Sequence, residues 1–549
     1  MEKRPSSVIN VLFKSIVIVS LALAIGNNMI NNTTHNIAVR DALGYLLVGV
    51  ICFYIYIAFI ASKLKNNIIN RMIKSIGVFF LGCIVINVIY KINVLGKLAQ
   101  DVLGWGLLIG TMYLIYKIIK GDVIKVSNFK NKKEEEGIIF GKRGSKIYYM
   151  PESETGHVSV IGGAGTGKSQ SVSIPTLLTW KGAAVVIDIK KELCSMTSTF
   201  REKKLNSKVY VFDPDDNNCD CYDPLEQVKG SIDGANELAR NLIPTPIKGD
   251  KFWVNNAQAI LASAVLDGID KNQTFSEICE RILITKPEDL INELTESNNV
   301  QVKLLASSAN GMPDKTLGGV FSELRVHILT FASDEKIKMA TRKTNWTPAV
   351  LEEGATVYFR ISEKMIEQYK GLISCMIAQM FRYLTSRKDR QQPAILMLLD
   401  ELPRLGRVDG LIEALGTLRS RNVHIVPMIQ SLSDLDRHYG QAERKIILDN
   451  CSYKVILGVG DVDTQKYFSD ASGTKKVWQK SYNNSALLGL NKGNTDSLVE
   501  EKVIKPERFG QLKQDKKSVI LGFKDPIEVD KLFAYSTSKY KRIIETYKI

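Results

Sequence analysis

One stretch decides the fold of this chain: His157-Val-Ser-Val-Ile-Gly162-Gly-Ala-Gly-Thr-Gly167-Lys168-Ser169. A short β-branched run breaks into glycines and then opens a helical stretch at 170–178. This is the strand, loop and helix context that the pattern G-x-x-x-x-G-K-[ST] requires. Glycines let backbone N–H groups close around phosphate oxygens, because a Cβ atom would block the positive φ values and the close approach. The stretch therefore predicts a phosphate-binding loop, with ATP and Mg²⁺ as the expected ligands.

Each part of this loop has an expected role. Lys168 would reach the β- and γ-phosphates, and the hydroxyl of Ser169 would hold Mg²⁺. The positive end of the following helix would add to the attraction for phosphate. The alternative is a glycine-rich turn that binds nothing, and the complete match in the right context disfavours it. The residues predicted to surround the nucleotide are Gly162, Gly163, Ala164, Gly165, Thr166, Gly167, Lys168 and Ser169.

A second apolar strand, at 393–399, ends in two carboxylates and lies 232 residues after Lys168. An acid at the end of a strand beside the phosphate loop can hold the Mg²⁺ shell, a role that we assign to Asp400. Glu401 is then placed to polarise the attacking water. Two solvated acids in a turn are the alternative. The combination with a phosphate loop favours a catalytic pair.

Further candidates for catalysis follow. A strand at 423–429 ends in Gln430, whose amide could orient water or sense the γ-phosphate, or could belong to an ordinary turn. Arg404 and Arg407 follow the acidic pair, and a neighbouring subunit could insert such a cation into the site. The guanidinium suits transition-state phosphate charge because it is planar and always protonated. Surface charge or salt bridging is the alternative. Two more arginines lie downstream, Arg419 and Arg421.

The pattern around these motifs predicts an α/β domain interrupted by helices. Apolar strands at 183–188 and 209–213 are separated by helices, which implies a parallel sheet covered on both faces. Strands resume at 355–361. Between them lie amphipathic helical stretches at 232–242, 252–269, 276–284, 287–297 and 317–331. We therefore predict a nucleotide-binding domain at 151–227 and 346–549, and an inserted all-α domain at 228–345.

Two features of these domains have more than one interpretation. The segment Asp188-Ile-Lys-Lys-Glu192 follows its strand at the carboxyl end, where open α/β sheets place ligands. Its charged residues either touch nucleotide or a neighbouring subunit, or cap the next helix. In the helical insertion, Phe252 and Trp253 are expected to be core residues rather than platforms for stacking bases.

The first 120 residues predict a membrane region. Apolar stretches at 9–30, 41–61, 72–92 and 98–119 are each close to the ~20 residues that cross a bilayer as a helix. Buried core helices are the alternative. This part of the chain contains twelve Lys or Arg and only three acidic residues, so it carries +9 of the net charge of +15. Most of these cations fall in segments that become cytoplasmic if both ends are inside. We expect a multi-pass protein of the cell membrane with most of its chain in the cytoplasm.

Charge and cysteine content narrow the class of protein. The basic charge is mainly topological, and therefore a weak sign of nucleic-acid binding. The eight cysteines lack the spacing of a zinc site, and we expect most of them to be reduced and buried. Residues 121–150 are predicted to be a juxtamembrane linker followed by a β-hairpin.

Together these motifs resemble those of the type IV coupling proteins, the membrane ATPases that feed substrates to conjugative and related type IV secretion channels. The most specific part of the match is Leu399-Asp-Glu-Leu-Pro-Arg-Leu-Gly-Arg407 together with the strand end Gln430-Ser431. The resemblance implies a RecA-like P-loop NTPase domain, an all-α domain that takes part in substrate selection, and a homo-hexamer. It also implies ATP-driven transfer of single-stranded DNA, usually with a covalently attached relaxase, through partners in the secretion channel.

The expected membrane region departs from this family, because better-known members usually carry two membrane helices around a larger external loop. A septal chromosome translocase also joins four membrane helices to a RecA-like ring. However, the sequence has neither a long low-complexity linker nor a C-terminal winged-helix candidate. A non-hydrolysing docking receptor is a third possibility. Intact Lys168, Asp400 and Glu401 disfavour it.

Overall fold

The structure, a computed structural model, describes residues 136–228, 231–247, 249–483 and 493–548. They belong to one compact unit, Glu134–Ile549. Within the described part of the chain, no helix is both long and apolar enough to span a bilayer. The four membrane helices predicted within residues 1–120, and the linker up to residue 135, lie outside the described residues. The membrane topology therefore stays a prediction.

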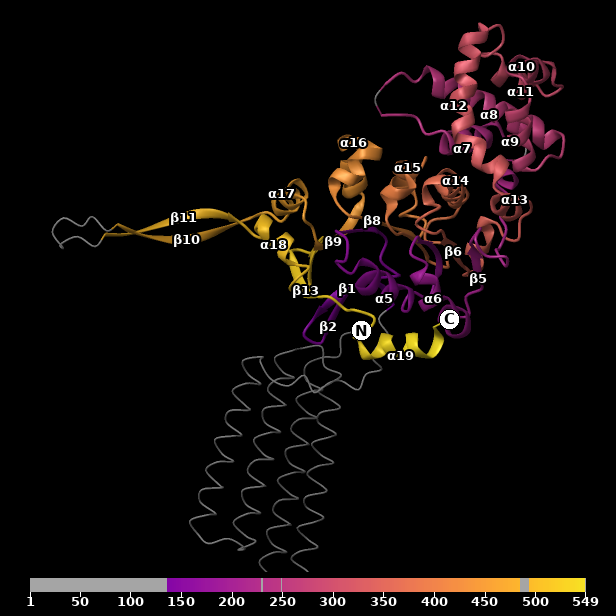
Figure 1. The fold of residues 1–549 in the computed structure, drawn as a ribbon. Helices are drawn as coiled ribbons and strands as arrows, with labels where there is room; N and C mark the ends of the chain where they lie inside the picture. The colour runs from indigo at the N-terminus through magenta and orange to yellow at the C-terminus, as the bar shows by residue number, and fades with distance from the viewer. Residues whose placement is uncertain (1–135, 229–230, 248, 484–492, 549) are drawn as a thin grey trace, which may run out of the picture. The chain divides into compact units, whose positions relative to one another are not determined.

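The described residues form an eleven-stranded sheet with the order β2-β1-β13-β12-β9-β3-β8-β7-β4-β6-β5 (Figure 1). Neighbours from β9 to β5 pair in parallel, and neighbours from β2 to β9 pair antiparallel. The predicted parallel sheet is therefore right for the seven strands from β9 to β5, and β1 and β2 pair as the antiparallel hairpin that was predicted before residue 151. It is wrong for β12 and β13, because the short turn between them leaves no room for the crossover that parallel neighbours need. The strands are β1 (Gly137–Arg143), β2 (Lys146–Pro151), β3 (His157–Gly162), β4 (Ala183–Asp188), β5 (Val209–Phe212), β6 (Thr356–Arg360), β7 (Ile395–Leu399), β8 (Val423–Ile429), β9 (Cys451–Gly458), β12 (Lys517–Leu521) and β13 (Ile527–Asp530).

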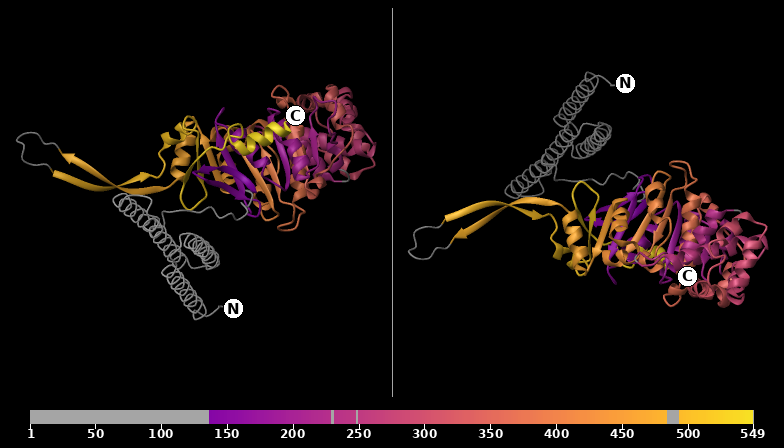
Figure 2. Two further views of the ribbon diagram at one scale, coloured as in Figure 1. Left: turned by 90° about the horizontal axis from the view of Figure 1, so that it is seen from below. Right: turned by 90° about the horizontal axis from the view of Figure 1, so that it is seen from above.

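Helices cover both faces of the sheet, as predicted (Figure 2). Alternate side chains of β4 show why, since Val185 and Ile187 join one buried core while Ala184 and Val186 join the other. All four are fully buried, as expected for a strand with helices above and below. The helices of this part are α5 (Ile174–Leu177), α6 (Glu192–Leu205), α14 (Ile366–Leu384), α15 (Leu411–Thr417), α16 (Leu432–Asp449), α17 (Val462–Ala471), α18 (Pro506–Gln511) and α19 (Ser538–Tyr547).

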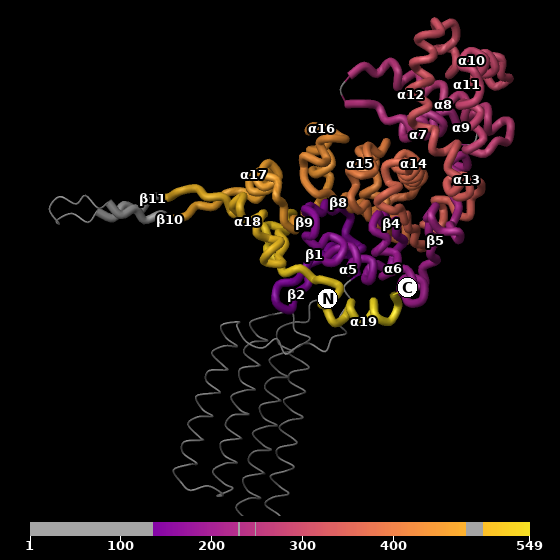
Figure 3. Tube along the Cα trace, in the orientation of Figure 1, coloured from indigo at the N-terminus to yellow at the C-terminus, as the bar shows by residue number. Residues whose placement is uncertain are grey.

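The chain leaves the sheet after β5, runs through a series of helices and returns at β6 (Figure 3). The five helices predicted here are present, and two short ones, α11 and α13, were not predicted because seven residues carry little periodicity. The helices are α7 (Ile232–Leu242), α8 (Phe252–Asp270), α9 (Phe275–Ile284), α10 (Pro287–Glu296), α11 (Val300–Ala306), α12 (Asp314–Ser333) and α13 (Glu335–Thr341).

The expectation that Phe252 and Trp253 are core residues is wrong. Their exposed fractions are 42% and 38%. They occupy the first turn of α8, whose buried face begins only at Val254, and their rings contact each other edge to face with centroids 5.2 Å apart. A helical pattern gives the face of a helix but not where its neighbours end, so a first turn can extend beyond the core.

Two other elements complete the described chain. The strands β10 (Thr474–Asn483) and β11 (Gly493–Lys502) form a separate two-stranded antiparallel sheet.

A buried arginine joins the phosphate-loop helix to the main sheet. Arg201 of α6 is fully buried, and its guanidinium donates hydrogen bonds to Leu177 O, Trp180 O, Gly182 O and Thr356 Oγ1. Leu177 ends α5, Trp180 and Gly182 follow it, and Thr356 lies on β6, so the guanidinium joins the end of the phosphate-loop helix to the sheet.

Candidate nucleotide-binding site

The phosphate loop, Gln430 and the acidic pair all follow the carboxyl ends of neighbouring parallel strands. Register places Ile161 of β3 opposite Ile429 of β8, and Leu399 of β7 opposite Pro427 of β8. The residues that follow these strand ends are therefore neighbours, as expected for the carboxyl ends of parallel strands. The strand that carries Asp400 is not next to the phosphate-loop strand. Strand β8 lies between them, and Gln430 is the residue that follows it.

The phosphate loop has the backbone conformation that its glycines permit. Gly165 and Gly167 have φ values of +69° and +94°, which other residues rarely adopt. A Cβ atom on Gly167 would lie 2.7 Å from Cε1 of Phe533, so even alanine would collide there. The ammonium of Lys168 donates to Gly162 O at 2.6 Å. Burial lowers the pKa of Lys168, and the nearby charges of Asp400 and Glu401 oppose that shift.

Two lysines that the sequence analysis missed donate hydrogen bonds to backbone carbonyls of the phosphate loop. The buried ammonium of Lys531 donates to Thr166 O at 2.9 Å and to Leu457 O at 2.6 Å, and burial lowers its pKa to about 8. The exposed Lys513 donates to Ala164 O at 3.0 Å. Both lysines lie more than 340 residues after the loop in sequence and belong to no motif, so no local pattern could have found them.

The acidic pair is buried, with exposed fractions of 4% for Asp400 and 6% for Glu401. Burial, and after it the charge of Glu401, raises the pKa of Asp400 to about 7, although the charge of Lys168 opposes the shift. The Oδ1 atom of Asp400 is buried and has no hydrogen-bond partner. An orphaned carboxylate oxygen next to a phosphate loop fits a cation.

A magnesium ion here would depend on the nucleotide for most of its ligands. Among the described residues, no group of three or more His, Cys, Asp or Glu side chains could hold a metal ion. Mg²⁺ usually takes one or two protein ligands together with phosphate and water oxygens. The carboxylate of Asp400 and the hydroxyl of the half-buried Ser169 suit that arrangement.

Glu401 is held by two cations of its own chain. Its backbone is left-handed, with φ 53° and ψ 46°. Its Oε1 lies 3.5 Å from Nζ of Lys190, and its Oε2 lies 3.5 Å from Nη1 of Arg404. A strained backbone and two ion pairs fix where this carboxylate points.

The other predicted catalytic residues are placed as follows. Arg404 is also 3.6 Å from Glu363, so it lies beside the acid of its own chain. Arg407 makes a two-pronged ion pair with Glu443, with distances of 2.5 and 2.9 Å. Gln430 is half-buried at the end of β8. The roles of these three residues in catalysis stay predictions.

The segment Asp188-Ile-Lys-Lys-Glu192 caps α6 and forms ion pairs with two acidic residues that follow other strands. The Oδ2 atom of Asp188 accepts a hydrogen bond from Cys194 N at 2.8 Å, so Asp188 caps α6, as one of the two interpretations expected. Lys190 reaches Glu401, and Lys191 reaches Asp213. The pair of lysines thus connects Glu401, after β7, to Asp213, after β5.

The raised pKa of Asp400 predicts a pH dependence of nucleotide binding. The folded pKa lies above that of a free Asp, so below about pH 7 the carboxyl keeps a proton that Mg²⁺ must displace. The affinity for Mg²⁺-nucleotide should therefore rise between about pH 5 and 7, by up to about tenfold per unit, and level off above the pKa. Binding of a fluorescent nucleotide across this range measures the slope.

The control for this prediction is Asp400→Asn measured in the same buffers, because the ionisation of the nucleotide itself is then the same in both proteins. The variant should bind more weakly and with a flatter pH profile. An equal slope in the two proteins would assign the titration to a group other than Asp400.

Comparison with known proteins adds family evidence to this geometry. The protein family described as Type IV secretory system Conjugative DNA transfer matches residues 113–549. Protein VirD4 of Rhizobium radiobacter is 26% identical over 434 residues, which cover 75% of this chain and 62% of that protein. Conjugal transfer protein TraG of Escherichia coli is 22% identical over 436 residues, covering 72% of this chain and 68% of TraG. The match thus spans less than two thirds of the VirD4 relative.

Solved structures share the fold. The plasmid coupling protein TrwB in complex with the non-hydrolysable ATP analogue ADPNP matches with a TM-score of 0.58 and 19% identity, over 73% of this chain and 90% of that one. TrwB in complex with ADP and Mg²⁺ matches with a TM-score of 0.57 and 19% identity, over 73% and 89%. At this identity the likeness is one of architecture: a mixed sheet with helices on both faces.

Proposed function

Because this chain belongs to the Type IV secretory system conjugative DNA transfer family, we propose that it is a coupling ATPase. It recruits single-stranded DNA with its attached relaxase, or protein substrates, and drives them to a type IV secretion channel. The observation that carries the proposal is a buried acidic pair at the same sheet edge as an intact phosphate loop. The TrwB structures with ADPNP and with ADP and Mg²⁺ support a RecA-like nucleotide site in this fold.

The residues at the site divide the work of hydrolysis. The loop amides and Lys168 bind the phosphates, so Lys168 exchanges Gly162 O for phosphate oxygens. Ser169 and Asp400 would hold Mg²⁺, and the bound ion would supply positive charge to the phosphates. Glu401 accepts a proton from the water that attacks the γ-phosphorus, and ADP leaves. The site thereby gives the three functions that phosphoryl transfer needs: positioning, charge neutralisation and a base.

Assembly and location belong to the same proposal. The chain works as a homo-hexamer anchored by its first 120 residues in the cell membrane, with the nucleotide-binding part in the cytoplasm. Arg404 or Arg407 of one subunit contributes charge to the site of the next, and Gln430 senses the γ-phosphate. For this role each arginine must leave partners in its own chain, Arg404 the carboxylates of Glu401 and Glu363 and Arg407 that of Glu443.

The test is ATP turnover by the full chain in a lipid or detergent environment, with and without single-stranded DNA. DNA should stimulate turnover severalfold. The stimulation should fade between about 50 and 200 mM salt, because Lys and Arg that bind the backbone release counterions. Turnover that ignores DNA at every salt concentration would contradict the motor, and absence of turnover would favour a docking receptor.

A further inference from the structure

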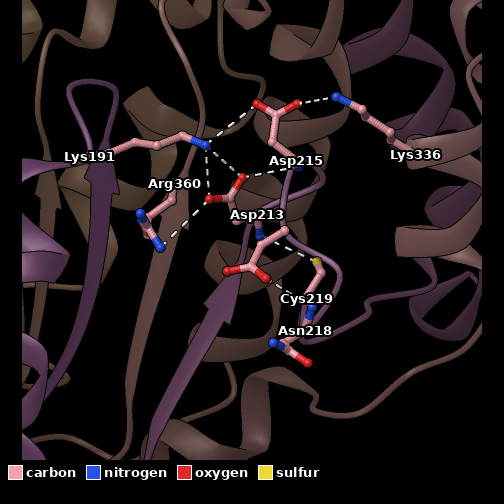
Figure 4. Close-up of polar contacts among 8 residues, drawn as sticks. Lys191, Asp213, Asp215, Asn218, Cys219, Lys336 and Arg360 are labelled. Atoms are coloured by element: carbon pink, nitrogen blue, oxygen red, sulfur yellow. Dashed lines mark hydrogen bonds and ion pairs between the residues drawn. The ribbon is translucent and has the colours of Figure 1, made fainter. Parts of the chain in front are cut away.

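Charged side chains connect the helical insertion to the edge of the sheet (Figure 4). The ammonium of Lys191 lies 2.9 Å from both carboxylate oxygens of Asp213 and 3.5 Å from Oδ2 of Asp215. The other oxygen of Asp215 lies 2.8 Å from Nζ of Lys336 on α13. These four residues, Lys191, Asp213, Asp215 and Lys336, are called the edge network below.

Asp213, in the middle of the edge network, is buried, so its ion pairs are costly to break. The side chain of Asp213 is only 3% exposed, so its carboxylate needs nearby cations. Lys191 supplies one, and Arg360 supplies a second at 3.7 Å. Lys191 has a left-handed backbone with φ 57°, which a residue with a Cβ adopts only when its surroundings hold it there. The ion pair with Asp213 is one of the contacts that hold Lys191 in place.

The residue before Lys191 contacts Glu401, the proposed base. Lys190 pairs with Glu401 at 3.5 Å, whereas Lys191 pairs with Asp213. The residues in these contacts end or follow four strands that are successive neighbours in the sheet: β7, β4, β6 and β5. Because Lys190 and Lys191 share a peptide bond, a movement of one changes the position of the other.

The far end of the edge network is tied to the helical insertion. Lys336 lies in the first turn of α13, and Asp334 caps that helix by accepting a hydrogen bond from Lys336 N at 2.9 Å. The other oxygen of Asp334 accepts a hydrogen bond from Oη of Tyr369 on α14, at 2.7 Å. The hydrogen bond from Lys336 also lowers the pKa of Asp215 and so keeps it charged. The start of α13 therefore contacts the nucleotide-binding part at two points.

We propose that Lys190 is a positioning residue for Glu401, and that the edge network makes its position depend on α13. A substrate that displaces α13 would then change how the base is aimed, so that the helical insertion sets the rate of hydrolysis. This inference rests on the proposed ATPase function and adds the route by which the insertion controls it. Every ion pair on this route, from Lys336 through Asp215 to the two lysines and Glu401, is present in the structure.

The test uses steady-state ATP hydrolysis by the full chain. Lys190→Met should lower kcat at least tenfold and leave KM within about twofold, because the base is misaimed while nucleotide contacts remain. Lys336→Gln should lower kcat about three- to tenfold, again without a change in KM. Lys336→Arg should keep kcat near the wild-type value, since it restores the pair with Asp215. Lys336 is 57% exposed, so its substitution opens no core.

The matched control is Lys338→Gln on the same helix, because the partners of Lys338, Glu280 and Glu335, both belong to the helical insertion. This variant should hydrolyse ATP like the wild type. The decisive comparison is Lys336→Gln in the Lys190→Met background, where it should have no further effect, because both act through Glu401.

Two results separate this inference from the function on which it rests. If the wild type hydrolyses ATP but Lys336→Gln equals Lys338→Gln, or adds fully to Lys190→Met, the edge network does not control Glu401 and the ATPase stands. If the wild type hydrolyses no ATP, both proposals fail together.

Discussion

Glu401→Gln should lower the rate of ATP hydrolysis by about 10²- to 10⁴-fold, the usual contribution of a general base. Glutamine keeps the shape of the side chain but cannot take the proton from water. Nucleotide affinity should stay within about threefold, because Lys168, Ser169 and Asp400 are unchanged. Phosphate release in a single turnover and binding of a fluorescent nucleotide measure the two quantities separately.

The matched control is Glu363→Gln. Glu363 shares the partner Arg404 with Glu401, but its side chain is 57% exposed. Its loss should change turnover less than threefold. A Glu401→Gln protein that retains more than a tenth of wild-type turnover would show that another group acts as the base.

Lys168→Ala should weaken ATP binding by roughly 10²- to 10⁴-fold. A charge-assisted hydrogen bond is worth about 1.5–3 kcal/mol, and Lys168 is expected to make at least two to the phosphates. The same change removes the hydrogen bond to Gly162 O. The measurement is equilibrium binding of a non-hydrolysable ATP analogue, with thermal unfolding recorded in parallel to show that the variant is folded.

Lys513→Ala is the control for that variant, because Lys513 is also a lysine at the loop, donates to Ala164 O and is exposed. It should bind the analogue within about threefold of the wild type. If Lys513→Ala loses binding and Lys168→Ala keeps it, the loop holds phosphate in a different way from the one proposed.

The sequence predicted those parts of the site whose signals are local. The phosphate loop and the acidic pair each combine an apolar strand with a short polar end, and parallel strands bring such ends to one edge. The helices on both faces were predicted from the apolar run that precedes Asp188 in β4. The helical insertion was predicted from the 3.6-residue spacing of its apolar residues.

Long-range pairings carried no such signal. The antiparallel strands β12 and β13 lie at the end of the chain, and nothing in their sequence shows that they continue a parallel sheet. The ion pair of Arg407 with Glu443 and the contact of Lys531 with Thr166 O depend on three-dimensional neighbours. The two lysines at 190 and 191 are adjacent in sequence and have different partners, which only the fold decides.

The most direct test of the central claim, that hydrolysis at this sheet edge drives substrate transfer, is a mating assay in the host that carries the chain. The wild-type gene is replaced by the Glu401→Gln version, with protein level and membrane fraction checked. Transfer of DNA should fall by at least about 10²-fold, following the loss of the base. Transfer at the wild-type frequency would contradict the claim, because the site would then be dispensable for the motor.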